Sequence, residues 1–283
     1  IIINVLCEMK RNISVILPVH SRIDAKHFEV AILSIINQSQ KVFEIITVVD
    51  GPVSKALLDK INKFNEHELV NIIFSKTNNG PGFSRNIAIN HSKGDIIALM
   101  DADDISRNNR FEIQLSHFLK NNNDMLGGLV SEFYETVGDS NFIRKVPTCY
   151  KEIKKNMAIR MPFNNVTLMF TRELYIKSGG YKNLKYLEDY ELNFRMFLHS
   201  TNASNVNHIL VDVRTERSNA QFIRRLGFDY FIEEVKLFHY MQKIKFISKS
   251  YFFFTIISRA VVRLGPKWIS KYIYWKFRKK YNS

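Results

Sequence analysis

The sequence is poor in cysteine, tryptophan and proline, with two, two and six of them among 283 residues. Two cysteines, Cys7 and Cys149, are too few for a disulfide framework or a zinc site, so we interpret each as a small packing residue. A reducing cytosol is the simplest setting for such a chain. No apolar run reaches the ~18 to 20 residues of a membrane span. Ile1–Cys7 is apolar, but it has no basic leader or small-residue cleavage site, so we do not interpret it as a signal peptide.

Acidic residues are outnumbered, 27 against 41 Lys and Arg, which gives a net charge of +14. The excess is confined to one segment, because Lys236–Ser283 contains twelve Lys or Arg and no Asp or Glu. The rest of the chain is therefore nearly neutral, at +2. A composition that is 46% hydrophobic and 24% charged is ordinary for a globular protein and excludes disorder of the whole chain.

The order of apolar patterns predicts an α/β fold. Short apolar runs rich in β-branched residues predict strands over 13–19, 43–49, 70–75 and 95–100. Amphipathic patterns between them predict helices over 27–38, 53–64 and 83–91. This alternation predicts βαβ units, a mostly parallel sheet and right-handed crossovers. After Arg107 we expect helices over 110–119 and 188–198 and strands over 126–134, 166–171 and 208–213.

Polar residues that follow the predicted strands are the candidates for ligand binding, because open α/β sheets bind ligands beyond the carboxyl ends of their strands. Asp101-Ala102-Asp103-Asp104 places three carboxylates directly after a buried strand. Crowded carboxylates repel unless they are neutralised, and a hard divalent cation is a natural neutraliser. The alternative is a solvated acidic turn in which Asp104 caps the next helix.

Three further positions have both a functional and a structural interpretation. Asp50 ends the second strand and can accept hydrogen bonds from a ribose or base edge, or it is a turn residue before Gly51-Pro52. A glycine loop from Asn79 opens a helix that carries Arg85, which can reach a diphosphate. The Glu188-Asp189 pair opens another helix and supplies either a general base or helix capping.

The motifs in their order resemble the family 2 inverting glycosyltransferases of the GT-A fold. The matching segments, which run from Ile13 to Arg214, are VILPVH, SIINQS, VVDG, NGPGFSRN, DADD, SGGY and LEDYEL. The DGP, DADDIS, NNRFEIQ and LEDYEL segments are similar to the branch of bacterial enzymes that builds capsule, O-antigen and exopolysaccharide on a lipid carrier. The resemblance implies a Rossmann-like, mostly parallel sheet with an acceptor-side subdomain and a C-terminal basic helical segment.

The resemblance also implies roles for particular residues. Asp189 would be the catalytic base, Asp50 would contact uridine, and Asp101 and Asp103 would hold Mn²⁺ or Mg²⁺, with Asp103 nearest the metal. The donor side would comprise Pro18, His20, Asp50, Asn79, Arg85, Asp101, Ala102 and Asp103. The acceptor side would comprise Gly179, Gly180, Tyr181 and Glu188. The expected domains are 12–105 for the nucleotide sugar, 106–215 for the acceptor and catalysis, and 216–283 for the basic tail.

The sequence departs from the family pattern at three places. The usual A-R-N is Ser84-Arg85-Asn86, and the usual D-D-G-S is V-D-G-P around Asp50, which leaves one acid. The branch often has His-Pro before the acceptor-side strand, where this chain has Asn165-Val166. The last departure indicates a different acceptor sugar. By resemblance, the reaction is transfer from a UDP-sugar to a lipid-linked saccharide.

The basic tail, Lys236–Ser283, also carries thirteen aromatic residues, including Trp268 and Trp275. Trp and Tyr favour the membrane interface, and Lys and Arg favour anionic lipid. We therefore expect a cytoplasmic protein that is peripheral on the inner face of the bacterial plasma membrane. The alternative is a C-terminal helical unit that packs on the core and turns its cations to solvent.

Three rival functions remain open at this stage. A related enzyme of the same fold would transfer sugar to polyprenyl phosphate itself. A nucleic-acid-binding protein would have no need of Asp101, Asp103 or Asp189 and would bind with steep salt dependence, and we expect no nucleic-acid partner. A dinucleotide-dependent oxidoreductase would need a G-x-G-x-x-G loop after the first strand, where His20 to Asp24 contain no glycine.

Overall fold

The computed structural model of the chain describes residues 11–216, 223–266, 268 and 270–272. The predictions for Ile1–Cys7 and Trp275 lie outside these residues. The strands are β1 (Ile13–His20), β2 (Glu44–Asp50), β3 (Val70–Ser75), β4 (Ile96–Leu99), β5 (Ile105–Ser106), β6 (Met125–Phe133), β7 (Ile143–Arg144), β8 (Met169–Thr171) and β9 (Ala203–Arg214). The helices are α1 (Ala25–Ile36), α2 (Lys55–Phe64), α3 (Pro81–His91), α4 (Arg110–Lys120), α5 (Tyr150–Met157), α6 (Arg172–Lys177), α7 (Glu188–His199), α9 (Phe228–Lys243) and α10 (Lys249–Leu264), with a 3₁₀ turn η1 (Asn165–Thr167).

One curled sheet organises the described residues, with strand order β3-β2-β1-β4-β8-β6-β9-β5 and β7 beside β6. The first four strands in this order are parallel, as are β6 and β9, while β8 runs antiparallel to both of its neighbours. The predicted mostly parallel α/β sheet is therefore confirmed. His20 and Asp50 are register partners at the carboxyl ends of β1 and β2. Because β4 is parallel to β1 and ends at Leu99, the acidic segment after it opens at the same edge.

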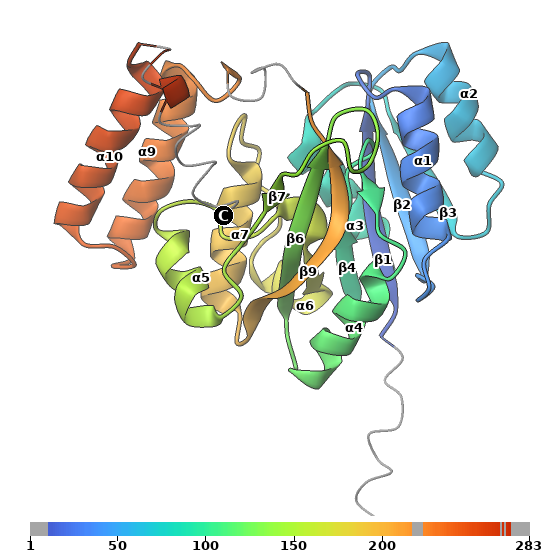
Figure 1. Cartoon of the computed structure of the whole chain (residues 1–283), viewed down its shortest axis with the longest axis horizontal. Coiled ribbons are helices and arrows are strands. Elements are labelled where there is room, and N and C mark those ends of the chain that lie inside the picture. Colours follow the sequence, from blue (N-terminus) through green and yellow to red (C-terminus); the bar gives the residue numbers. More distant parts are fainter. Residues whose placement is uncertain (1–10, 217–222, 267, 269, 273–283) are drawn as a thin grey trace, which may run out of the picture.

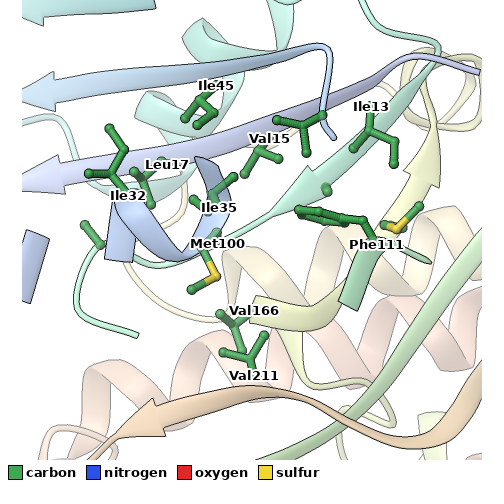
Figure 2. Packing of buried hydrophobic residues seen from close by; sticks show 14 of the residues in the cluster. Ile13, Val15, Leu17, Ile32, Ile35, Ile45, Met100, Phe111, Val166 and Val211 are labelled. Atoms are coloured by element: carbon green, nitrogen blue, oxygen red, sulfur yellow. The ribbon is translucent and has the colours of Figure 1, made fainter. Parts of the chain in front are cut away.

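The alternation of side chains along each strand divides the core between the two faces of the sheet. Val15 and Leu17 of β1 pack in one cluster with apolar residues of α1, α2 and α4. Figure 2 shows this cluster from close by, with Ile32 and Ile35 of α1 and Phe111 of α4. Ile16 of the same strand belongs to the other cluster, with apolar residues of α3, α5, α6, α7 and α9. Figure 1 shows α1 and α2 at one end of the molecule and α9 and α10 at the other.

The second half of the chain departs from the sequence prediction in three elements. The strand expected over 166–171 begins only at Met169, because Thr167 holds a 3₁₀ turn with its hydroxyl, which accepts the N–H of Gly128 at 3.0 Å and donates to the carbonyl of Asn164 at 2.7 Å. The strand expected from His208 begins at Ala203, because its polar first part pairs with β6. The pattern gave no indication of α5, and Cys149, which precedes it, is exposed rather than packed.

The two C-terminal helices pack on the core through a buried carboxylate. Leu237, Phe238 and Met241 of α9 belong to the cluster that also contains α7. The carboxylate of Glu234 accepts from Arg259 at 3.0 Å and from Arg263 at 2.8 Å, which fastens α10 to α9. The described part of the basic tail is therefore a helical pair against the core. In the described residues, no helix combines the length and the apolar character that crossing a bilayer requires.

Replacement of Glu234 by glutamine is expected to destabilise the protein by about 3–5 kcal/mol, because it leaves two partly buried guanidinium groups without their carboxylate. The matched control is Glu233→Gln, whose ion pair with the exposed Lys236 is worth less than about 1 kcal/mol. Urea unfolding followed by circular dichroism measures both free energies. Equal losses in the two variants would show that the buried carboxylate does not fasten the helices.

Candidate active site

The acidic segment after β4 separates its three carboxylates by environment. Asp101 and Asp103 line a cleft and are partly exposed, whereas Ala102 and Asp104 are buried. The Asp104 carboxylate accepts the backbone N–H of Arg214 at 2.8 Å. The next helix, α4, begins after Asn109, with no side-chain cap. The prediction that Asp104 caps this helix is therefore wrong, because its side chain is held by β9 instead.

The electrostatics of this segment favour a positive ligand. Burial and the charge of Asp101 raise the pKa of Asp103 to about 6. Burial, together with Asp101 and Asp103, also raises the pKa of Asp104 well above its ordinary value. Arg214 opposes the effect at Asp103, and its Nε donates to the Asp103 carbonyl at 3.3 Å. A cation beside Asp101 and Asp103 would therefore relieve the repulsion between these carboxylates.

Arg85 joins the acidic segment to the start of α7. This arginine lies on α3 with 6% of its side chain exposed. Its Nη2 donates to Asp101 at 2.9 Å, and its Nη1 donates to Asp189 Oδ1 at 3.0 Å. Burial acts against its charge, but Asp189 and Asp101 raise the pKa of Arg85 above its ordinary value. One planar guanidinium thus fixes the two carboxylates relative to each other. A contact of Arg85 with a donor diphosphate stays a prediction.

The Glu188-Asp189 pair stands at the N-terminus of α7, directly after a strained residue. Leu187 has a φ of 63°, a left-handed conformation that side chains rarely adopt and that clusters at functional sites. Burial raises the pKa of Asp189, while Arg85 acts in the opposite direction. Burial and the charge of Asp189 raise the pKa of Glu188 to about 7. Both carboxylates line the cleft that contains Asp101.

The Gly179-Gly180 turn positions Tyr181 against the pair. Both glycines have positive φ, and a Cβ on Gly180 would lie 3.0 Å from Tyr175 Oη. The side chain of Asn86 fixes the turn, since it accepts the Tyr181 N–H at 2.9 Å and donates to the Tyr181 carbonyl at 2.7 Å. Tyr181 Oη in turn donates to Asp189 Oδ1 at 3.2 Å. The glycine turn therefore acts on the site through Tyr181.

The predicted donor residues Pro18 and His20 lie on β1, Asp50 ends β2, and Asn79 lies in the loop after β3, which Asp50 anchors. Asp50 is buried, and its two oxygens accept the backbone N–H groups of Asn79 and Gly80, each at 2.9 Å. The Asn79 amide bonds within its own loop, to Thr77 among others. Burial lowers the pKa of His20, and the charges of Asp101 and Asp50 act in the opposite direction. Pro18 lies half-buried in β1. The predicted uridine and donor contacts of these residues stay predictions.

The cleft itself measures about 2290 Å³ and runs from the acidic segment to α10. Asp101, Asp103 and Asp189 lie on its wall, and so do Phe254 and Ser258 of α10. This volume exceeds the ~300–1,000 Å³ of a pocket for one small ligand, so the cleft has room for two substrates. The geometry therefore places the paired acids Asp101 and Asp103 and the carboxylate of Asp189 on the wall of one cleft.

Comparison with known proteins identifies the family. The model of glycosyl transferase family 2 matches residues 14–178, more than half of the chain. The chain belongs to glycosyl transferase family 2. This glycosyltransferase is 31% identical over 269 residues, 95% of the chain and 97% of the relative, to the Escherichia coli UDP-Gal:alpha-D-GlcNAc-diphosphoundecaprenol beta-1,3-galactosyltransferase. It is 26% identical to the amylovoran biosynthesis glycosyltransferase AmsE of Erwinia amylovora, over 94% of the chain and 99% of that protein. The predicted resemblance to the bacterial polysaccharide branch is confirmed.

Solved structures share the fold of the glycosyltransferase. TarS of S. aureus, in complex with UDP-GlcNAc, superposes with a TM-score of 0.68 at 14% identity, over 88% of this chain and 72% of that one. The mannosyltransferase PcManGT of Pyrobaculum calidifontis, in complex with GDP-Man and Mn²⁺, gives 0.60 at 15% identity, over 89% and 69%. The predicted GT-A fold is confirmed.

The carboxylates of the glycosyltransferase fit a cation that is shared with substrate phosphates. Asp101 and Asp103 line the cleft, and burial together with the charge of Asp101 raises the pKa of Asp103, an effect that a bound cation would oppose. Among the residues that the structure describes, no group of three or more His, Cys, Asp or Glu is arranged to hold a metal by itself. Mg²⁺ bound between substrate phosphates takes one or two protein carboxylates and completes its shell with phosphate oxygens and water. Asp101 and Asp103 are two carboxylates that fit such a partly protein-bound cation.

Sequence reasoning missed several residues of the site. Arg214 contacts the acidic segment. Asn165 was noted only as a departure from the family pattern, but it lies beside Asp189 and opposes the rise that burial causes in the pKa of Asp189. Asn86 was visible in the Ser84-Arg85-Asn86 motif, but its role depends on a turn 95 positions away. Arg214 sits at the end of a strand with no pattern that marks it. Contacts over such separations carry no local signal.

Proposed function

We propose that this glycosyltransferase moves a hexose or N-acetylhexosamine from a UDP-sugar to a hydroxyl of a lipid-linked, polyprenyl diphosphate saccharide in the synthesis of O-antigen or capsule. The observation that carries the proposal is the link that Arg85 makes between Asp101 on the donor side and Asp189 in one cleft. Similarity over nearly the full length of a relative named for a UDP-galactose donor and a diphosphoundecaprenol acceptor supports the choice of substrates.

The proposed reaction is a single displacement that inverts the anomeric centre. Asp189 takes the proton of the acceptor hydroxyl as that oxygen forms its bond to the anomeric carbon. The bond from the anomeric carbon to the phosphate oxygen breaks with oxocarbenium character, and UDP leaves with the electron pair. Arg85 and Tyr181 both donate to Oδ1 of Asp189, so we assign the proton transfer to Oδ2. An α-linked donor gives a β-linked product.

The acidic segment acts on the leaving group in this proposal. Mn²⁺ or Mg²⁺, when bound by Asp103 and Asp101, supplies Lewis-acid neutralisation of the diphosphate. Arg214 holds the segment through the Asp103 carbonyl and the Asp104 carboxylate. The chain thereby orients the carboxylates before the donor arrives.

Thermal shift with nucleotide sugars tests the donor and the metal. UDP-galactose, UDP-glucose and UDP-N-acetylhexosamines are expected to raise the melting temperature in the presence of Mn²⁺, because a ligand that binds the native state stabilises it by mass action. EDTA is expected to abolish most of the shift, and so is Asp103→Asn. A shift that persists in EDTA contradicts the metal role, and a larger shift with GDP-sugars contradicts the choice of donor.

The proposed location is the inner face of the bacterial plasma membrane, where the protein is peripheral. The basic tail supports it, since Lys236–Ser283 contains twelve cations and no acid. Polybasic segments are drawn to the anionic cytoplasmic leaflet. An acceptor with a polyprenyl chain resides in that membrane.

A further inference from the structure

The outer face of α10 carries an apolar row whose side chains are about half exposed or more in the described structure. Phe254, Ile257, Val261, Leu264 and Trp268 follow one another at spacings of three and four residues, and each is at least 47% exposed. This spacing places them on one side of a helix. Single exposed apolar residues are ordinary, but a continuous row marks an interaction surface. We call these five residues the outer row.

The outer row is separate from the face that holds α10 in the fold. Tyr251, Phe252 and Ile256 pack against the core, and Arg259 and Arg263 reach Glu234 on α9. These inward residues follow their own spacing of three and four along the other side of the helix. The outer row is therefore not needed to attach α10, and its exposure requires another explanation.

The charge around the outer row matches an anionic bilayer. Lys249 in the first turn of α10 and Lys271 beyond its end are exposed and flank the row. The acid that faces the inner side of α10, Glu234, is engaged by Arg259 and Arg263. An apolar row with tryptophan, flanked by cations and without acids, has the chemistry of helices that lie in the membrane interface. Binding to a protein partner would not require a whole segment that carries positive charges and no negative charges.

The outer row borders the cleft of the active site. Phe254 and Val261 belong to the row and also line the cleft that contains Asp189. Figure 1 shows α10 at the edge of the molecule, where a flat surface can reach it. A bilayer against the row would therefore lie beside the wall that α10 contributes to the cleft.

We propose that the outer row of α10 docks on the anionic bilayer surface, so that a lipid-linked acceptor enters the cleft along the wall formed by α10 and presents its saccharide to Asp189. This orientation rests on the proposed acceptor, whereas the docking itself does not. The saccharide points away from the lipid, and the nucleotide sugar enters from the side of the acidic segment. The membrane then determines the sides from which the acceptor and the nucleotide sugar enter the cleft.

The test uses the full chain and the triple variant Ile257→Ser, Leu264→Ser, Trp268→Ser, whose three residues do not line the cleft. A matched control replaces three exposed apolar residues elsewhere, Phe74, Leu119 and Ile176, by serine. Co-sedimentation uses vesicles of phosphatidylethanolamine and phosphatidylglycerol, with phosphatidylcholine alone as the neutral comparison. We expect the triple variant to lose more than about tenfold in binding to the anionic vesicles, since one buried apolar side chain is worth about that much.

Three outcomes overturn the docking. Binding of the triple variant equal to that of the control variant would show that the cations alone attract lipid. Equal binding of the wild type to neutral and anionic vesicles would remove the argument from charge. A change from dimer to monomer in the triple variant, measured by sedimentation velocity, would show that a second copy covers the row.

Activity separates this proposal from the proposed function. Two acceptors carry the same saccharide diphosphate, one on a long prenyl chain in vesicles and one on a short, water-soluble chain. The triple variant is expected to match the wild type on the soluble acceptor and to be more than about tenfold slower on the vesicles. Equal loss on both acceptors would overturn the orientation. If the wild type used neither acceptor, the proposed function would fail, while co-sedimentation would still decide the docking.

Discussion

Replacement of Asp189 by asparagine is expected to lower kcat about 10²–10⁴-fold, the usual contribution of a positioned general base. Asparagine has the same shape, and its Oδ1 can still accept from Arg85 and Tyr181, which now contact that atom at 3.0 and 3.2 Å. The amide cannot take the proton of the acceptor hydroxyl. The KM for the donor is expected to change little, because the acidic segment is untouched. Steady-state kinetics with both substrates varied gives the two constants.

Glu188→Gln is the matched control for this variant. Glu188 lines the same cleft one residue earlier, and burial raises its pKa to about 7. A general base works deprotonated, so kcat/KM falls as the pH drops through the pKa of that base. If Glu188 were the base, activity would fall below about pH 7 and Glu188→Gln would carry the larger loss. That result would transfer the role of base from Asp189 to Glu188.

The first half of the fold was predictable because its signals are local. Strands such as 13–19 and 70–75 are apolar runs bounded by polar turns, and the structure has strands at Ile13–His20 and Val70–Ser75. Helices between them have regular apolar faces. The acidic segment after β4 could be placed at the ligand edge because parallel strands end together. Its first carboxylate, Asp101, faces the cleft as the prediction required.

The second half was harder because tertiary contacts decide its local structure. Thr167 has a strand-like sequence around it, yet its hydroxyl is used to close a turn against β6. Asp104 has a sequence position suited to a helix cap, yet the N–H that it accepts comes from Arg214, 110 positions later. The carboxylate also lies buried rather than in solvent. No window of sequence contains both partners of such a contact.

The contacts of Arg85 with two carboxylates could not be predicted from the sequence, for the same reason. Its two partners lie 16 and 104 positions away, on a loop and on the first turn of α7. The motif identified a cation that opens a helix, and a cation at such a place is typical of diphosphate binding. The contacts now assign it a positioning role between the two carboxylates. The donor role and the positioning role can be separated by experiment.

Arg85→Lys is expected to lower kcat about 10²-fold, because a single ammonium cannot replace a fork that bridges two carboxylates, and a displacement of about 1 Å at a reacting group costs that much. The control is Arg172→Lys. Arg172 also donates through its whole guanidinium, to the carbonyls of Gly94 and Ile89 and to Ser92 Oγ, but these partners lie away from the cleft. We expect Arg172→Lys to lower the melting temperature and to leave the pH profile unchanged. Arg85→Lys is expected to shift the acidic limb of the pH profile of kcat/KM.

The double variant Arg85→Lys, Asp189→Asn identifies the route by which Arg85 acts. If Arg85 works by holding Asp189, the double variant is no slower than Asp189→Asn alone, since residues that act as a unit are not additive. If Arg85 contacts the donor diphosphate directly, the two losses multiply and the KM for the UDP-sugar rises. The side chain of Arg85 is 6% exposed and donates to both Asp101 and Asp189, so we expect the first result. In that case this arginine ties the position of the base to the carboxylate on the donor side.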